Sequence, residues 1–201
     1  MSENSLAPLP DDFAPMLDFL RSHEPISDDD AALISRHACI RCYKRGEILL
    51  KEGQTARELF FITHGILKMV SVNEKGREVV HFFLKEDQFC TVLDSFYNNA
   101  PAHIGLVAAC DTELVVFPKE QLNQLFDKLP FFKVLLDKVI RQRLLDKLRL
   151  KNNYAGKDAT VRYQTFLAEQ SDIALHVPLS DIASYLQVTL QSLSRIRNKI
   201  S

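Results

Sequence analysis

The stretch Pro178 to Ile200, which reads P-L-S-D-I-A-S-Y-L-Q-V-T-L-Q-S-L-S-R-I-R-N-K-I, decides how the rest of this chain of 201 residues is interpreted. Its pattern predicts two short helices joined by the segment Gln187-Val188-Thr189. Thr189 is a good N-cap for the second helix, because its hydroxyl can accept a hydrogen bond from an exposed backbone N–H of the first turn. The second helix is therefore expected to start directly after Thr189.

The second helix of this stretch has an apolar side and a polar side. Leu193, Ile196 and Ile200 follow one another at i, i+3 and i+7, which places them on one stripe. In the first helix Ile182 and Leu186 repeat at i and i+4, so the two apolar sides can pack together. The opposite side of the second helix is hydrogen-bonding and basic, with Gln191, Ser192, Arg195 and Lys199.

Such a pattern is typical of a DNA-binding helix-turn-helix. The second helix of that motif enters the major groove and presents its N-terminal polar side chains to base edges. Gln187 stands at the turn position that glycine often occupies, so a left-handed backbone there would be mildly strained. The alternative is two ordinary surface helices, since short motifs also arise by chance.

Basic residues accompany this motif. The whole chain has a formal net charge of −1, from 25 Lys and Arg against 26 Asp and Glu. From Arg141 to Ser201 there are ten Lys or Arg and five Asp or Glu, and no acid follows Asp181. The distribution favours phosphate contact by the C-terminal part. The alternative is a basic face that is merely solvated.

The composition is that of a globular protein, because 46% hydrophobic residues are ample for a buried core. The longest apolar runs are far too short to span a bilayer. The N-terminus lacks a basic start followed by an apolar stretch, so no signal peptide is expected. We therefore expect a cytoplasmic protein without a membrane partner, in which four cysteines stay reduced: Cys39, Cys42, Cys90 and Cys110.

The first part of the chain changes from helical to β-rich texture. Met1 to Pro10 are expected to form a loose tail, and Asp11 to Ser22 and Ser27 to His37 to form short helices. From about Ala38 to Pro118, short β-prone runs alternate with turn residues, and Asn73 to Gly76 predicts a hairpin turn. About eight strands predict a small barrel or double-sheet roll. Alternation places in its interior Ile48, Leu50, Leu59, Phe61, Ile66, Val80, Phe82, Leu114 and Val116.

A helical region follows the roll. Lys119 to Asp127 predicts one helix, and a long helix is expected from Pro130 to about Asn153, because leucine and isoleucine recur at steps of four. Its apolar arc is wider than one neighbour needs, so we predict a dimerisation helix; the alternative is a helix buried within one chain. Asn152 to Gly156 predicts a hinge before a helix over Lys157 to Gln170. The predicted dimer interface is Leu136, Val139, Ile140, Leu144 and Leu148.

The predicted fold class is α+β, with a double-sheet β-roll at residues 1–128, a dimerisation helix at 129–153 and a helix-turn-helix domain at 154–201. This order resembles the Crp/Fnr family of bacterial transcription regulators nearly end to end. The segments that carry the resemblance are Lys44-Arg45-Gly46-Glu47, Glu52-Gly53, Leu59-Phe60-Phe61-Ile62-x-x-Gly65 and Ala108-x-x-Asp111-Thr112-Glu113-Leu114. The I-A-S-Y-L and L-S-R-I-R runs resemble a shorter branch known from Bacteroidetes, so a full C-terminal wing is not expected.

The resemblance implies a homodimer on a pseudo-palindromic DNA site, with an effector in the roll tuning the two recognition helices. By position in the motif, Gln191, Ser192 and Arg195 would reach base edges, and Arg195 is the best candidate for a bidentate contact to guanine. Phosphate contacts, which position the protein without specifying a sequence, would come from Thr189, Arg197 and Lys199. RNA polymerase would be a further partner of an activator.

The sequence departs from the family at the ligand pocket. Cyclic-nucleotide-binding members use a Gly-Glu pair to hold ribose and an Arg-Ser pair to neutralise the cyclic phosphate. The corresponding positions here are Thr91-Val92 and Pro101-Ala102-His103, so both charged groups are absent. A phosphate buried without a charged partner is costly. We expect no cofactor, a degenerate pocket at Thr91, Val92, Ala102 and His103, and no tight binding of cyclic AMP or GMP; a less charged effector, or none, stays open.

Other chemistries have less support. Cys39 and Cys42 have an odd spacing on an expected strand, so their side chains would diverge instead of holding an iron–sulfur cluster or zinc. We expect them to be buried and unreactive. The sequence has no His-x-His pair, P-loop, dinucleotide fingerprint or nucleophile elbow, so no enzyme is predicted. The second hypothesis is a sensor or protein-interaction roll whose C-terminal helices serve assembly.

Overall fold

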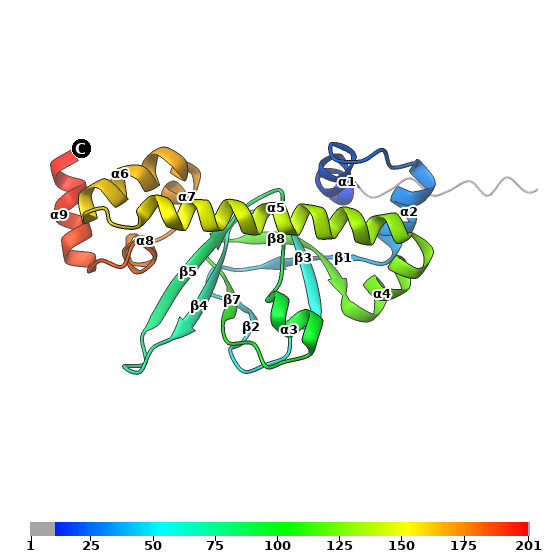
Figure 1. The fold of residues 1–201 in the computed structure, drawn as a ribbon, viewed down its shortest axis with the longest axis horizontal. Helices are drawn as coiled ribbons and strands as arrows, with labels where there is room; N and C mark the ends of the chain where they lie inside the picture. Colours follow the sequence, from blue (N-terminus) through cyan, green and yellow to red (C-terminus); the bar gives the residue numbers. More distant parts are fainter. Residues whose placement is uncertain (1–10, 201) are drawn as a thin grey trace, which may run out of the picture.

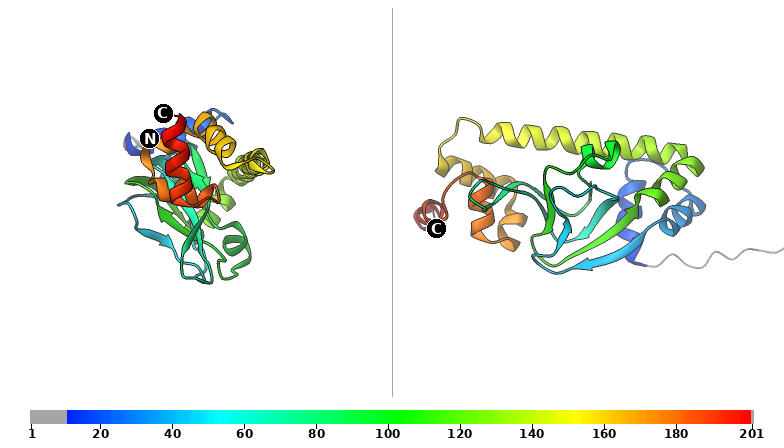
Figure 2. Two further views of the ribbon diagram at one scale, coloured as in Figure 1. Left: turned by 90° about the vertical axis from the view of Figure 1, so that its left-hand side faces the viewer. Right: turned by 90° about the horizontal axis from the view of Figure 1, so that it is seen from below.

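A β-roll forms the centre of the molecule in the computed structural model, which describes residues 11–200 (Figure 1). The long helix α5, Pro130–Tyr154, runs beside the roll for most of the length of the molecule. The N-terminal helices and α4 lie at one end, and α6 to α9 lie at the other (Figures 1 and 2). The predicted tail, Met1 to Pro10, falls outside the described residues.

The N-terminal segment forms the 3-10 turn η1 (Asp11–Phe13) and the helices α1 (Ala14–Arg21) and α2 (Asp28–Arg36), as predicted. Ser27 caps α2, because its hydroxyl oxygen accepts a hydrogen bond from the backbone N–H of Asp30 at 3.1 Å. The apolar sides of α1 and α2 belong to the main core. These helices therefore close one end of the roll.

The roll consists of antiparallel strands in two sheets, which confirms the predicted α+β class. One sheet has the order β1-β8-β3-β6 and the other the order β2-β7-β4-β5. The helix α3 (Leu93–Asn98) lies between β6 and β7 in the chain. The strands are β1 (Cys39–Tyr43), β2 (Ile48–Leu50), β3 (Glu58–His64), β4 (Leu67–Val72), β5 (Glu78–Leu84), β6 (Gln88–Cys90), β7 (Gly105–Ala108) and β8 (Thr112–Pro118).

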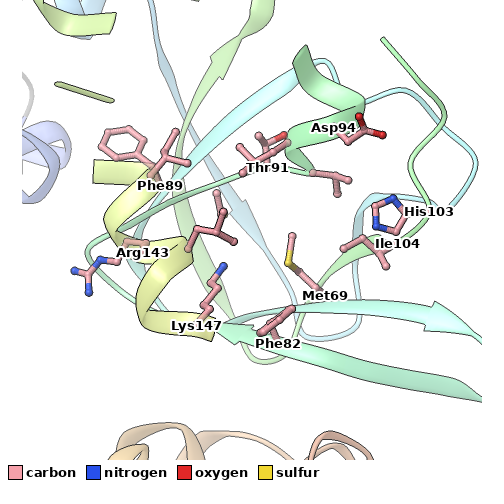
Figure 3. Close-up of a pocket in the computed structure, with 14 residues that line it drawn as sticks. Met69, Phe82, Phe89, Thr91, Asp94, His103, Ile104, Arg143 and Lys147 are labelled. Atoms are coloured by element: carbon pink, nitrogen blue, oxygen red, sulfur yellow. The ribbon is translucent and has the colours of Figure 1, made fainter. Parts of the chain in front are cut away.

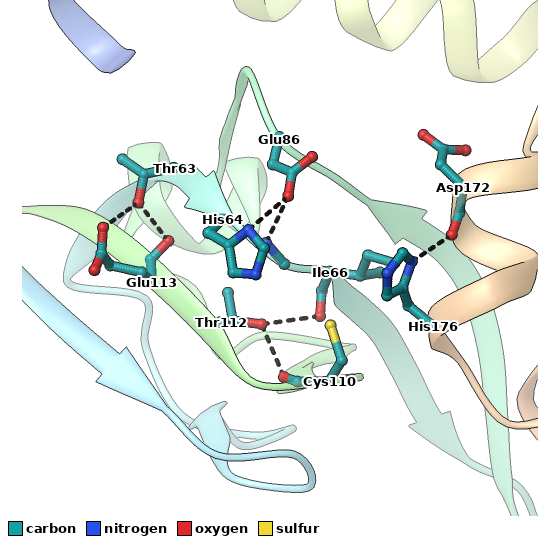
Figure 4. A network of polar contacts seen from close by, with 10 residues as sticks. Thr63, His64, Ile66, Glu86, Cys110, Thr112, Glu113, Asp172 and His176 are labelled. Carbon is teal, nitrogen blue, oxygen red and sulfur yellow. Dashed lines mark hydrogen bonds and ion pairs between the residues drawn. The ribbon is translucent and has the colours of Figure 1, made fainter. Parts of the chain in front are cut away.

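A tight turn joins β3 to β4, and polar contacts hold it in place (Figure 4). Gly65 has a φ of +92°, and a Cβ there would lie 2.5 Å from the carbonyl oxygen of Asp111, so only glycine fits. The backbone N–H of Gly65 donates to Glu86 Oε1 at 2.9 Å. The same carboxylate lies 3.1 Å from Nδ1 of His64. The turn is thus fixed to the loop that follows β5.

Most residues predicted for the interior of the roll are buried, but they do not all lie on the same face of their sheet. Ile66 and Val80 are buried, but they pack with the C-terminal helices. Ile48 is 52% exposed, so its prediction is wrong; it lies on the short edge strand β2. Phe82 is only partly buried and lines a pocket. Leu50, Leu114 and Val116 are buried as predicted. Leu59 and Phe61 are also buried, but they lie on the opposite face of the sheet from Leu114 and Val116, where Phe61 packs against Phe19 of α1.

The hairpin of β4 and β5 turns at Asn73–Gly76, as predicted, and the N–H of Asn73 donates to the carbonyl of Arg77 at 2.9 Å. After the roll come α4 (Lys119–Lys128) and α5, both close to their predicted bounds. The proline at the start of α5 occupies the first turn, where its missing N–H is tolerated.

The C-terminal part contains α6 (Ala159–Glu169), α7 (Ser171–His176), α8 (Leu179–Tyr185) and α9 (Leu190–Ile200). The helices α6, α8 and α9 were predicted, whereas α7 has no counterpart in the prediction. Gly156 follows α5 with a φ of +72°, at the predicted hinge. Among residues 11–200, no helix has the length and apolar character that a membrane crossing requires.

Candidate functional site

The turn between α8 and α9 has the conformation that a helix-turn-helix requires. The hydroxyl oxygen of Thr189 accepts a hydrogen bond from the backbone N–H of Ser192 at 3.1 Å, which confirms the predicted N-cap. Gln187 has a φ of +56°, so its backbone adopts the left-handed conformation anticipated from the sequence. The N–H of Val188 donates to the carbonyl of Ala183 at 2.9 Å and closes the turn.

The helix α9 lies at one end of the molecule (Figure 2). Its exposed residues are mostly polar or basic. Leu193 is fully buried and holds α9 against α8 and α6, whereas Ile196 is partly buried and Ile200, in the last turn, is 38% exposed. The apolar stripe is therefore complete only in the first two turns. The predicted DNA-contacting residues all lie on the exposed surface: Thr189, Gln191, Ser192, Arg195, Arg197 and Lys199.

The helix-turn-helix is packed against the roll through α8. Phe83 of β5 lies with its ring centroid 5.2 Å from that of Tyr185 and 6.4 Å from that of Phe166. Val80 and Val70 join the same apolar cluster. The C-terminal helices therefore share a core with the outer face of the β4–β5 ladder.

Polar contacts surround this shared core. Lys68 of β4 is only 11% exposed at its side chain and pairs with Glu78 and, at 3.0 Å, with Asp181 of α8. Burial alone would lower the pKa of Lys68, but the hydrogen bonds to both carboxylates hold it above its ordinary value. Ser184 accepts a hydrogen bond from the N–H of Val80 at 2.9 Å. These contacts fix the orientation of α8 on the roll.

A second ion pair at the same contact is more exposed. Lys85, just after β5, contacts Asp172 of α7, and the two side chains are 42% and 46% exposed. The ion pair lies partly in water, so its attraction is screened. Of the two links, the one through Lys68 is the better shielded.

The predicted dimer face of α5 divides into a buried and an exposed part. Leu136 and Val139 are 2% and 3% exposed because they pack on the roll within the same chain. Ile140 is partly buried. Leu144 and Leu148 are 46% and 49% exposed. Of the predicted set, Leu144 and Leu148 in the second half of α5 are therefore the members that stay most exposed within one chain.

Neighbouring Leu145 extends this exposed part of α5, because it is 44% exposed. Together Leu144, Leu145 and Leu148 form the "distal face" of α5. Sequence alone could not separate these leucines from Leu136, since both sets continue the same apolar pattern.

A pocket of about 250 Å³ lies between α5, the β4–β5 ladder and the segment from β6 to α3 (Figure 3). Most of its lining is apolar, and Thr91, Asp94, His103, Arg143 and Lys147 add polar groups. Among the apolar side chains are Met69, Phe82, Val92, Ile104, Ile140 and Leu144.

The pocket and the helix-turn-helix meet opposite faces of one ladder. Met69 pairs with Phe82, and both line the pocket. The adjacent pair, Lys68 and Phe83, points toward α8, since side chains alternate along a strand. Only the β4–β5 ladder therefore separates the pocket from the helix-turn-helix.

Comparison with known proteins identifies the architecture. Residues 40–128 match the family model of the cyclic nucleotide-binding domain. The transcriptional activator protein Anr of Pseudomonas aeruginosa is 23% identical over 167 residues, which cover 78% of this chain and 68% of Anr. The cAMP-activated global transcriptional regulator CRP of Salmonella typhimurium is 24% identical over 156 residues, or 76% of this chain and 74% of CRP. The chain resembles regulators of the Crp/Fnr type.

A solved structure shares the fold of this Crp/Fnr-like chain. The c-di-GMP-responsive global regulator CLP of Xanthomonas campestris superposes with a TM-score of 0.68 at 18% identity, over 87% of this chain and 91% of the CLP chain. The relatives named here are transcription regulators and not enzymes. The resemblance to the Bacteroidetes branch stays a prediction.

The sequence-predicted ligand residues of the Crp/Fnr-like roll do not all reach the pocket. Thr91, Val92 and His103 line it. Ala102 lies outside the lining and is 2% exposed, and its backbone N–H donates to the carbonyl of Gln54 at 2.8 Å. The pocket is therefore built from fewer of these residues than predicted.

Sequence reasoning missed the contribution of α5 to the pocket. Ile140, Arg143, Leu144 and Lys147 lie at i, i+3, i+4 and i+7, so they share one face of the helix. The apolar members were assigned to a dimer interface, and the basic members to the general basic balance. The helical spacing shared by the apolar and the basic residues could have indicated that they line one site.

The cysteines of this Crp/Fnr-like chain differ from expectation. Cys39 and Cys42 are exposed on the edge strand β1, so the prediction that they are buried is wrong. Cys90 is buried, which raises the pKa of its thiol to about 12. Over residues 11–200, no group of three or more His, Cys, Asp or Glu is placed to hold a metal ion.

Proposed function

We propose that this Crp/Fnr-like chain is a sequence-specific DNA-binding regulator that acts as a homodimer on a pseudo-palindromic site. The observation that carries the proposal is the capped helix α9, which Leu193 anchors while its first two turns expose polar and basic side chains. A helix presented in this way can enter the major groove.

The roles of the exposed residues follow from their chemistry. Gln191 and Ser192 lie in the first turn of α9, nearest to the base edges in the usual docking. Arg195, in the next turn, can contact guanine O6 and N7 with two parallel hydrogen bonds. The proposed contacts to the DNA backbone come from Thr189, Arg197 and Lys199. They would fix the register of the protein on the DNA.

The distal face of α5 supplies the proposed dimer contact. Leu144, Leu145 and Leu148 are each close to half exposed on one stretch of helix. Two-fold pairing of this face would place the α9 helices of both protomers in one symmetric dimer. Such a dimer reads two half-sites whose centres lie about 34 Å apart, one turn of DNA. The operator would then be palindromic.

The effector is proposed to be something other than a cyclic nucleotide. Thr91 and Val92 stand where a ribose-binding glutamate would be needed, and the hydroxyl of Thr91 already donates to the carbonyl of Glu58 at 2.9 Å. Ribose hydroxyls would therefore lose water without gaining partners. Because DNA is the proposed target, action in the cytoplasm follows, and RNA polymerase would be a partner if the protein activates.

Selection of bound sequences from a random pool of duplexes tests this function. Ligand-free full-length protein at moderate salt should enrich a palindrome, and added salt should weaken binding steeply because phosphate contacts release counterions. Arg195→Ala should cost about 1–3 kcal/mol on the enriched site and relax the preference at one base pair per half-site. The matched control is Arg36→Ala, which removes an exposed arginine at the end of the molecule opposite to α9. This variant should bind DNA like the parent protein.

Two results would contradict the proposal. One is a folded dimer that enriches no sequence, whether or not a pocket ligand is present. The other is an Arg195→Ala variant with an unchanged sequence preference. Either would favour the second hypothesis, in which the C-terminal helices serve assembly.

A further inference from the structure

Charged groups of opposite sign lie on opposite sides of the pocket between α5 and the roll. Its α5 side carries Arg143 and Lys147, and the opposite side carries Asp94 (Figure 3). Asp94 is exposed and accepts a hydrogen bond from Asn98 at 2.7 Å. Apart from Thr91 and His103, the remaining side chains of the lining are apolar or belong to Cys90.

Lys147 is the cation that points into this pocket. Its ammonium lies 5.6 Å from the centroid of the Phe82 ring, and it forms no hydrogen bond or ion pair with any residue in the described part of the chain. Arg143 points away from the other lining side chains and donates to the carbonyl of Asp87 at 3.3 Å (Figure 3). Burial lowers the pKa of Lys147, as expected for an ammonium without a carboxylate beside it.

A lysine in such surroundings needs an anionic partner. The charged form loses hydration in an apolar pocket, and a single aromatic ring compensates for only part of that loss. The nearby thiol of Cys90 is protonated at neutral pH because burial raises its pKa to about 12, so it offers no negative charge. The pocket therefore has one positive charge, on Lys147, that a bound anion could neutralise.

We propose that this pocket binds a small monocarboxylate with an apolar body. The carboxylate accepts a hydrogen bond from Lys147 Nζ, and the apolar body packs against Met69, Phe82 and Ile104. A cavity of about 250 Å³ is below the range of drug-sized sites, so the ligand is small. The exposed carboxylate of Asp94 repels a second anionic group, which disfavours dicarboxylates.

The position of the pocket gives this ligand a route to the rest of the molecule. Leu144 lines the pocket and also belongs to the distal face of α5. Met69 and Phe82 lie on the ladder whose other face holds α8. The inference deepens the proposed function, because the ligand would be its effector, but binding itself can be measured without DNA.

Calorimetric titration of the full-length protein tests the inference with octanoate, its neutral isostere octanamide and the dianion octanedioate. The parent protein should bind octanoate about tenfold or more tightly than either of the others, because only octanoate gains a charged hydrogen bond without repulsion by Asp94. Lys147→Met should abolish the preference for the acid over the amide, and Lys147→Arg should retain part of it. Lys133→Met removes an exposed charge from α5 and should bind like the parent.

Several outcomes would overturn the inference. They are equal affinity for octanoate and octanamide in the parent protein, an unchanged preference in Lys147→Met, and tighter Lys147-dependent binding of cyclic AMP. Absence of saturable binding by octanoate, hexanoate and 3-phenylpropanoate up to about 1 mM would do the same. The comparison of acid and amide needs no variant, so it holds even if a substitution impairs folding. Failure to bind these acids leaves the DNA-selection result unaffected, and the two proposals are tested independently.

Discussion

Substitution of Lys68 tests how the helix-turn-helix is held on the roll. Lys68→Met removes the ammonium that pairs with Glu78 and Asp181 while keeping a side chain of similar length. Breaking one partner of a fully buried pair costs about 3–5 kcal/mol. Glu78 is 40% exposed and Asp181 is 17% exposed, so water can partly rehydrate the two carboxylates. We therefore expect a loss of about 2 kcal/mol in the free energy of unfolding.

Lys85→Met is the matched control for this experiment. Lys85 also lies on the roll and also pairs with an aspartate of the C-terminal part, Asp172, but both side chains are more than 40% exposed. Exposed ion pairs contribute only about 0–1 kcal/mol. The two variants remove the same charge from the same contact and differ mainly in the burial of the ion pair.

The measurement is urea unfolding of both variants and the parent protein at one fixed concentration, since dimer stability depends on concentration. A folded-state pKa above the ordinary value means that the contribution of Lys68 is complete below the ordinary lysine pKa and disappears only as pH rises through the raised value. The cost of Lys68→Met should thus be constant from about pH 6 to 9. Equal costs for the two variants, or a cost of Lys68→Met that falls within this pH range, would refute the reasoning.

Three further substitutions test other parts of the structure. Gly65→Ala should destabilise the protein by about 2–4 kcal/mol in urea unfolding, because its Cβ would meet the carbonyl oxygen of Asp111 and its φ is left-handed; a smaller cost than 1 kcal/mol would contradict this. Leu148→Asp should shift sedimentation toward the monomer, whereas Leu175→Asp, at a position that is 82% exposed on α7, should not; an intact dimer would count against the distal face. Thr189→Ala should cost about 1 kcal/mol of stability through loss of the N-cap, measured by thermal unfolding, and no change would show that the cap is unimportant.

The helix-turn-helix was the part of the site most accessible to sequence reasoning. Its signals are local: the threonine cap, the apolar spacing that buries Leu193, and the left-handed turn at Gln187 all depend on residues within one short stretch. The hairpin at Asn73–Gly76 was predictable for the same reason. Such features are decided by backbone hydrogen bonds that neighbouring residues make.

Burial was harder to predict where one element has several neighbours. Phe60 and Phe61 point to opposite faces of β3, yet both are buried, because Phe61 packs against Phe19 of α1 while Phe60 lies on the side of Leu49 and Leu50. Ile48 failed in the opposite direction, since an edge strand lacks a second neighbour. Alternation within a strand contains no information on which faces a helix will cover.

The sequence by itself determined the order of elements, the capped recognition helix and the basic balance of the C-terminal part, because these depend on local spacing and composition. Only the tertiary structure decided that Leu136 packs inward while Leu148 stays exposed, that Lys147 enters the pocket, and that Lys68 meets Asp181 113 positions away along the chain. Those outcomes depend on how rigid elements dock on one another. Docking is a property of shapes and distances that residue spacing does not encode.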